Sequence, residues 1–201
     1  LSKKYNVELE NIVFDWYIEH PLFNNDIYSE NQKLNRLKFL IECSAKTGFK
    51  RIIFPLLENN NIDSEERKTK FFKIANKIKK LLQKYDIEMH LETSLNPNDE
   101  RNILKKLDCK WFKICFDMGN SASFGFEPEF ELSKIKEFLG TIHIKDRILG
   151  GESVPLGKGN VDFKTVFDII KKSKINVPYS FQVYRNKSSD NLKVLQESVN
   201  F

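Results

Sequence analysis

GTIHIKDRILGGESVPLGKGN, residues 140–160, is the stretch on which our prediction of the fold rests. Its first half alternates polar and apolar residues, which is typical of a buried strand. Thr141, His143 and Lys145 share one face of that strand, and two isoleucines share the other. A single histidine inside a strand is most often a core residue with satisfied hydrogen bonds. This stretch therefore indicates chemistry only if polar residues from other strands lie close to it.

Other predicted strands also end on polar residues. HLETS (residues 90–94) and FDMGN (residues 116–120) each end an apolar strand on a carboxylate, and FQVYR (residues 181–185) ends one on an amide. Carboxylates and an imidazole gathered from the ends of separate parallel strands are what a divalent metal site in an α/β barrel requires.

Strands and helices alternate along the whole sequence. We expect strands over residues 11–19, 51–58, 87–94, 111–120, 141–147 and 179–185. A helix begins at Ser29, with Gln32 in the capping-box position, and ends at Gly48. The remaining helices are expected around residues 71–82, 103–107, 130–139 and 166–170, and from Ser189 or Asp190 to Val199. Six strands alternating with six helices predict a parallel sheet in one domain, residues 1–201.

The number of strands favours an incomplete barrel. An open, doubly wound sheet would need a glycine-rich nucleotide-binding turn after the first strand, and HPLFNND (residues 20–26) is not one. We therefore predict an α/β fold of the TIM (β/α)8 type that lacks its first two βα units, so that the domain is incomplete at its N-terminal end. Seven of the eight glycines lie between Gly119 and Gly159, in loops expected on the catalytic rim.

Composition excludes several classes of function. The net charge is +5, but the lysines lie mostly on helix faces among acidic residues, which indicates a solvated surface and no nucleic-acid partner. Three widely spaced cysteines without a CxxC pair predict reduced thiols and a cytoplasmic location. No apolar run approaches 18 residues, so we expect no membrane association. The unpaired strand edges of an incomplete barrel favour a homodimer.

The last inward-facing residues of four strands are Glu92, Asp117, His143 and Gln182. This mixed set of donors suits Mn²⁺, Mg²⁺ or Co²⁺, and Zn²⁺ less well because no thiolate is included. Each carboxylate alone is more often a helix cap or a salt-bridge partner. Four such residues on consecutive strands are much less expected by chance.

Several of these segments together resemble the sugar phosphate isomerase/epimerase family of xylose-isomerase-like barrels. The resemblance rests on IHIKDR (142–147), FDMGN (116–120), LETSLNP (91–97), ESVPLGKGN (152–160) and FQVYR (181–185). FDWYIEHPL (14–22) also resembles the segment around the third strand of these proteins, in agreement with two units missing at the front.

The resemblance implies a divalent-metal-dependent isomerase or epimerase of a ketose or sugar phosphate, and among the ions that suit the donor set we expect Mn²⁺. Proton abstraction beside the carbonyl gives a metal-stabilised enediolate. Glu92 would be both ligand and base, and Asp117, His143 and Gln182 would complete the metal site. The predicted substrate-binding residues are Asn120, Arg147, Arg185 and the loop residues Gly157, Lys158 and Gly159, whose amides could cradle an anion.

One position departs from the family pattern. Many epimerases of this type carry a second glutamate on the last strand, where this chain has Gln182. An amide can bind a metal but cannot transfer a proton at neutral pH. Lys145 would then be the second catalytic residue, with Glu58 as an alternative, although a salt bridge is the ordinary role of both.

Two other readings remain open at this stage. One is a non-catalytic sugar-binding barrel that kept the pocket but lost a base. The other is a related metal-dependent dehydratase or lyase. An endonuclease acting at abasic sites fits poorly, because its trinuclear zinc cluster needs more histidines than the three that the chain contains.

Overall fold

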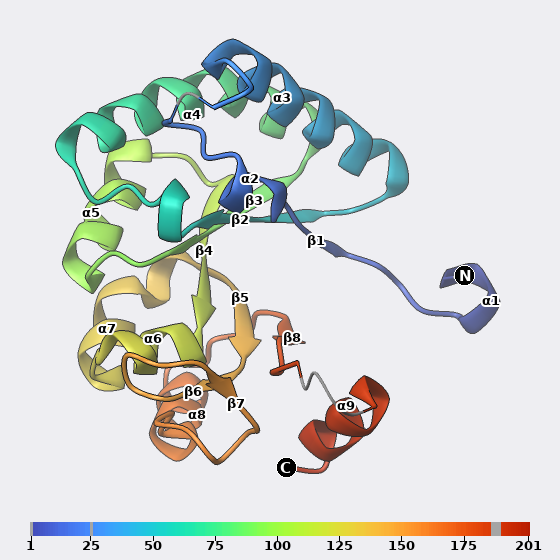
Figure 1. The fold of residues 1–201 in the computed structure, drawn as a ribbon, viewed down its shortest axis with the longest axis vertical. Helices are drawn as coiled ribbons and strands as arrows, with labels where there is room; N and C mark the ends of the chain where they lie inside the picture. Colours follow the sequence, from blue (N-terminus) through green and yellow to red (C-terminus); the bar gives the residue numbers. More distant parts are fainter. Residues whose placement is uncertain (1, 25, 186–189) are drawn as a thin grey trace. The chain divides into compact units, whose positions relative to one another are not determined.

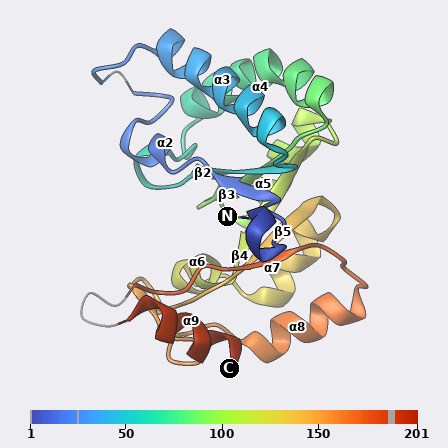
Figure 2. The same cartoon turned by 90° about the vertical axis from the view of Figure 1, so that its right-hand side faces the viewer.

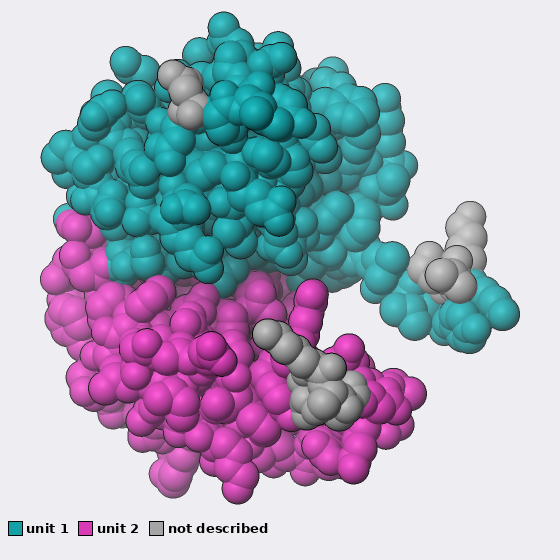
Figure 3. Space-filling view, in the orientation of Figure 1, with its two compact units in different colours: residues 1–95, 102–113 teal, residues 96–101, 114–201 magenta. Residues whose placement is uncertain are grey.

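The computed structural model describes residues 2–24, 26–185 and 190–201. The chain divides into two compact units, which Figure 3 colours separately. Unit 1 comprises Leu1–Leu95 and Asn102–Lys113, and unit 2 comprises Asn96–Arg101 and Ile114–Phe201.

Unit 1 is built on three parallel strands in the order β1-β2-β3. They are β1 (Asn11–Val13), β2 (Arg51–Leu56) and β3 (Glu88–Thr93). All six residues of β2 except the first are buried, as expected for a parallel strand covered on both faces.

Two short and two long helices of unit 1, with a 3-10 turn, precede β3. They are α1 (Ser2–Tyr5), α2 (Trp16–Glu19), α3 (Glu30–Thr47), the 3-10 turn η1 (Glu58–Asn60) and α4 (Glu65–Tyr85). The two long helices, α3 and α4, lie side by side in both ribbon views (Figures 1 and 2). Buried Leu37 and Ile41 of α3 and Phe71 and Ile78 of α4 form their apolar faces.

Both ends of α3 are encoded locally, as predicted. The Ser29 side chain accepts a hydrogen bond from the backbone N–H of Gln32, and the Gln32 side chain accepts one from the N–H of Ser29. At the other end Gly48 adopts a left-handed conformation, with φ +88°, and closes the last turn.

The first predicted strand, residues 11–19, was too long. β1 ends at Val13, and residues 16–19 form α2 instead. The helical turn buries Tyr17, whose ring lies 5.1 Å from that of Phe54 and whose hydroxyl donates to the Lys33 carbonyl at 3.0 Å. The aromatic residues of this segment favour a strand locally, but the tertiary contacts of Tyr17 are made by a helical turn.

Unit 2 also has three parallel strands, in the order β4-β5-β8. They are β4 (Phe112–Asp117), whose first two residues belong to unit 1, β5 (Leu139–Ile144) and β8 (Tyr179–Phe181). A short antiparallel hairpin of β6 (Asp146–Arg147) and β7 (Ser153–Val154) follows β5.

The remaining helices complete unit 2, although α5 continues into unit 1. They are α5 (Pro97–Leu107), α6 (Met118–Phe124), α7 (Pro128–Ile135), the 3-10 turn η2 (Lys136–Phe138), α8 (Phe163–Lys172) and α9 (Asn191–Val199). Asp190 caps α9 by accepting the N–H of Leu192, and Ser189, the alternative cap, lies outside the described residues.

The six predicted strands are confirmed, and they run parallel within each unit. The prediction of six helices is wrong, because the described residues contain additional short ones. The clearest case is α6: the strand predicted to Asn120 ends at Asp117, whose side chain accepts the Asn120 N–H and starts a helix. The last strand also ends earlier than predicted, at Phe181. Gln182 still donates its N–H to the Ile144 carbonyl, but β5 ends there.

Within the described residues, the helices are all too short or too polar to cross a lipid bilayer.

We predict that Gly48→Ala lowers the free energy of unfolding by about 1 kcal/mol. A Cβ at this position would meet no atom within 4 Å, so the whole cost arises from the left-handed backbone. Gly48→Asn should cost clearly less, because asparagine tolerates this conformation. Urea unfolding followed by circular dichroism measures both; equal losses in the two variants would contradict the backbone explanation.

Candidate functional site

Strand register in unit 2 places two predicted ligands next to each other. Asp117, the last residue of β4, lies opposite His143 of β5, and Asp117 Oδ2 is 3.6 Å from His143 Nδ1. Both residues are buried, with 4% and 3% of their surface exposed. Parallel pairing therefore brings together a carboxylate and an imidazole that are 26 positions apart in the sequence.

The two oxygens of Asp117 have different roles. Oδ1 accepts the Asn120 N–H at 2.7 Å and caps α6, which is the ordinary structural role that the sequence left open. Oδ2 is buried and has no hydrogen-bond partner among the described residues, although Lys145 Nζ lies 3.5 Å away. A buried carboxylate oxygen without a donor is costly, and a cation bound there would remove the cost. Asp117 and His143 therefore fit a divalent metal.

Cys115 is a neighbour that our sequence analysis treated only as a packing residue. Its Sγ and a ring nitrogen of His143 lie within 4.8 Å of each other. The alternation of β4 already placed Cys115 on the same face as Asp117, and this was the available signal. A thiol beside the imidazole makes Zn²⁺ a better candidate than the predicted donor set suggested.

Lys145 lies beside this pair, and it shares an amide partner with a second cation, Arg147. Lys145 Nζ donates to Gln182 Oε1 at 3.1 Å and lies 3.5 Å from Asn120 Oδ1. Arg147 Nη1 donates to the same Asn120 oxygen at 2.8 Å. The structure thus brings five of the predicted unit 2 residues into one network around Asp117.

Gly119 makes room for these cations. A Cβ at this position would lie 2.7 Å from Lys145 Cγ and 3.2 Å from Arg147 Cγ. Glycine is required at this position of the FDMGN segment for a steric reason, because a side chain would push against both Lys145 and Arg147.

The glycine-rich loop differs from the predicted anion cradle. The N–H groups of Gly157 and Gly159 donate to Asp146, at 2.9 and 2.8 Å, and the Lys158 N–H donates to the Pro155 carbonyl at 3.0 Å. A carboxylate of the chain itself therefore occupies the position expected for a substrate anion. Arg185, also predicted to bind substrate, is exposed.

Glu92, the predicted base, belongs to unit 1. It is the next-to-last residue of β3, is 4% exposed and lies opposite Pro55 in the register with β2. His90, on the same face of β3, lies 3.0 Å from Glu88, and burial lowers the pKa of His90 against the opposing influence of that carboxylate. Glu58, the alternative proton donor, is exposed at the start of η1.

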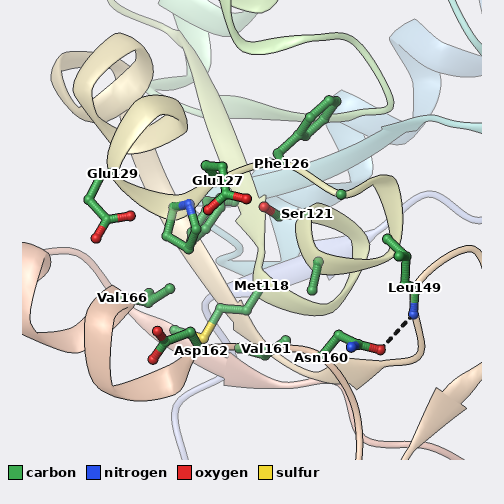
Figure 4. Close-up of a pocket in the computed structure, with 14 residues that line it drawn as sticks. Met118, Ser121, Phe126, Glu127, Glu129, Leu149, Asn160, Val161, Asp162 and Val166 are labelled. Carbon is green, nitrogen blue, oxygen red and sulfur yellow. Dashed lines mark hydrogen bonds between the residues drawn. The ribbon is translucent and has the colours of Figure 1, made fainter.

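A separate cavity of about 420 Å³ lies in unit 2, and none of the predicted site residues lines it. Figure 4 shows three carboxylates, Glu127, Glu129 and Asp162, at its edge, with Met118 and Val166 lining it. Phe116 also lines it, and because Phe116 alternates with Asp117 along β4, the cavity is on the opposite side of the strand from the Asp117–His143 pair.

Glu131 lies behind this cavity and is almost completely buried. The Ser121 hydroxyl, which lines the cavity, donates a hydrogen bond to the Glu131 carboxyl group. Burial raises the pKa of Glu131 to about 7, against the lowering influence of this hydrogen bond.

The sequence and fold of the chain match those of known proteins. The whole chain, residues 1–201, matches the family described as xylose isomerase-like TIM barrel. The protein belongs to this family.

The sequence identity between this chain and individual known proteins is low. The chain is 29% identical over 85 residues to the L-ribulose-5-phosphate 3-epimerase UlaE of Escherichia coli, a match that covers 42% of this chain and 30% of the relative. Among solved structures, an L-ribulose 3-epimerase aligns with a TM-score of 0.80 at 13% identity, over 100% of this chain and 76% of that one. The IolI protein with a bound zinc atom aligns with a TM-score of 0.75 at 18% identity, over 96% and 73%.

We predict that Glu131→Gln changes how stability depends on pH. Folded Glu131 holds its proton up to about pH 7, whereas the unfolded chain releases it near 4.5, so the wild-type free energy of unfolding falls between these values. The glutamine variant lacks this loss and should gain about 3 kcal/mol relative to the wild type between pH 4.5 and 8. Urea unfolding at several pH values measures it, with exposed Glu129→Gln as control; parallel curves for wild type and Glu131→Gln would contradict the assignment.

Proposed function

We propose that this protein is a divalent-metal-dependent isomerase or epimerase of a ketose or sugar phosphate. The observation that carries the proposal is the buried Asp117–His143 pair, with a carboxylate oxygen that lacks a hydrogen-bond partner among the described residues and lies 3.5 Å from Lys145 Nζ. Membership of the xylose isomerase-like family supports the same class of chemistry. The named epimerase is matched over less than a third of its length, so its substrate is only a guide.

The proposed metal ligands in unit 2 are Asp117, His143 and Gln182, and Glu92 of unit 1 remains a ligand predicted from the sequence. When bound, a divalent ion polarises the carbonyl and the neighbouring hydroxyl of the sugar. Mn²⁺ remains our prediction from the mixed donor set, and Cys115 beside His143 is the observation that favours Zn²⁺. The zinc bound by the IolI protein supports a divalent ion in general.

Different residues of the chain are proposed to remove and to return the proton. Glu92, at the carboxyl end of β3, is the proposed base that removes the proton beside the carbonyl. Lys145, hydrogen-bonded to Gln182 and next to Asp117, is the proposed donor of the second proton. Asn120 and Arg147 orient the sugar, and the guanidinium balances the negative charge that develops on the sugar oxygens.

A second candidate function has one observation in its favour. Gln182 stands where a second carboxylate is usual, and it accepts a hydrogen bond from Lys145. A sugar-binding protein without catalysis would tolerate such an amide equally well. A related dehydratase or lyase would use the same metal and the same base.

The predicted homodimer, single domain and cytoplasmic location remain proposals from the sequence.

The metal site is tested by elemental mass spectrometry of the purified chain after incubation with Mn²⁺ or Zn²⁺ and desalting. We expect about one ion per chain in the wild type, and loss of most of it in His143→Ala, because the imidazole is one of few ligands. His20→Ala, which removes a histidine of unit 1, should bind as the wild type does. Full occupancy in His143→Ala would exclude the proposed ligand set.

The proposed base is tested by proton exchange. Incubation with L-ribulose 5-phosphate or L-ribulose in D₂O should incorporate deuterium beside the carbonyl, and Glu92→Gln should slow incorporation at least about a hundredfold. Exposed Glu65→Gln is the matched control. Unchanged incorporation in Glu92→Gln would remove Glu92 as the base, while sugar binding without any incorporation in the wild type would favour the binding protein.

A further inference from the structure

Asp146 is a buried carboxylate of unit 2 that accepts four backbone hydrogen bonds and was not among the predicted site residues. It is 1% exposed and is the first residue of β6. Its Oδ2 accepts the N–H groups of Gly157 and Gly159, and its Oδ1 accepts those of Arg147 and Val161, at distances from 2.8 to 3.2 Å.

Such convergence of backbone N–H groups on one carboxylate is the arrangement that proteins use to bind anions. Each of these hydrogen bonds is assisted by the negative charge, so each is stronger than a bond between neutral groups. Three of the four donors come from residues 157–161, which are 11 to 15 positions away in the sequence. Asp146 therefore holds the glycine-rich loop against the hairpin.

The contact between the glycine-rich loop and Asp146 requires a glycine at position 159. A Cβ at Gly159 would collide with Asp146 Oδ1 and would lie 2.6 Å from the Arg147 carbonyl oxygen. Only glycine allows the loop backbone to approach the carboxylate this closely.

The same loop contacts hold Arg147. Its carbonyl accepts the N–H of Asn160 at 2.9 Å, and its own N–H donates to Asp146. Its side chain is then fixed at three nitrogens, because Nε and Nη2 donate to the Gly151 carbonyl at 3.1 and 2.7 Å while Nη1 donates to Asn120.

We propose that Asp146 is a positioning residue, whose buried carboxylate fixes residues 157–161 and thereby holds the Arg147 guanidinium on Asn120, next to Lys145 and Asp117. Its importance for sugar turnover rests on the proposed function. Because the amides of Gly157 and Gly159 are already used, the anionic part of a substrate is bound by side-chain cations such as Arg147.

The test uses ¹⁵N-labelled full-length chain carrying Asp146→Asn. An amide at this position turns an N–H₂ group toward the backbone N–H donors, so the converging bonds cannot all form. We expect the amide hydrogens of Gly157, Gly159 and Val161 to exchange at least about tenfold faster. The Arg147 Nε–H signal should lose its protection as well. Asp168→Asn, which removes an exposed carboxylate of α8 that pairs with Lys164, should change neither.

Two further measurements separate positioning from a general loss of structure. The dissociation constant for L-ribulose 5-phosphate should rise at least about tenfold in Asp146→Asn, and by no additional factor when the mutation is added to Arg147→Ala. Additive effects would show that Asp146 does not act through Arg147. If Asp146→Asn does not fold, Gly159→Ala is measured in the same way, since its Cβ disrupts the same contact.

The outcomes distinguish the two proposals. Unchanged exchange at Gly157 and Gly159, with a protected Arg147 Nε–H in Asp146→Asn, overturns the role of Asp146 whatever the protein binds. If the wild type neither binds the sugar phosphate nor exchanges its protons, the proposed function fails for this substrate class, and the nuclear magnetic resonance data still decide whether Asp146 positions Arg147.

Discussion

The carboxylate of Asp117 connects the fold of unit 2 to its chemistry. One oxygen caps α6 and ends β4, and the other lies buried beside His143 and Lys145. The cap orients the side chain, so the second oxygen is held in place before any ligand binds. The structural role and the proposed ligand role of this residue therefore do not compete, because they use different oxygens.

The two basic residues near Asp117 are hydrogen-bonded to neutral amide side chains. Lys145 and Arg147 share Asn120, and Lys145 also bonds Gln182. A glutamate at position 182 would form an ion pair with Lys145, whereas the amide accepts the Lys145 hydrogen bond without adding a negative charge, and Lys145 Nζ also lies 3.5 Å from Asp117. The departure from the family pattern thus has a local explanation in the partner that Gln182 binds. Gly119 completes this arrangement because it leaves space for both cations.

Much of the fold was predictable because its signals are local. The capping box at Ser29, the left-handed Gly48 and the buried run of β2 are each encoded within a few neighbouring residues, and each was found where expected. The errors occurred where distant contacts override local preference. Residues 16–19 have strand-forming side chains but turn into a helix because Tyr17 packs on Phe54 and bonds Lys33. The strand expected to continue to Asn120 ends because Asp117 caps a helix.

The sequence alone predicted which polar residues lie at or next to the ends of the strands, since alternation along a strand assigns each side chain to a face. It therefore predicted Asp117, His143, Lys145 and Gln182 as site residues, and strand pairing in unit 2 brought these four together. Only the tertiary structure decided what each group contacts. The amides of Gly157 and Gly159 donate to Asp146, Cys115 lies beside His143, and burial raises the pKa of Glu131. These properties depend on the distance and burial of groups far apart in the sequence, which periodicity does not encode.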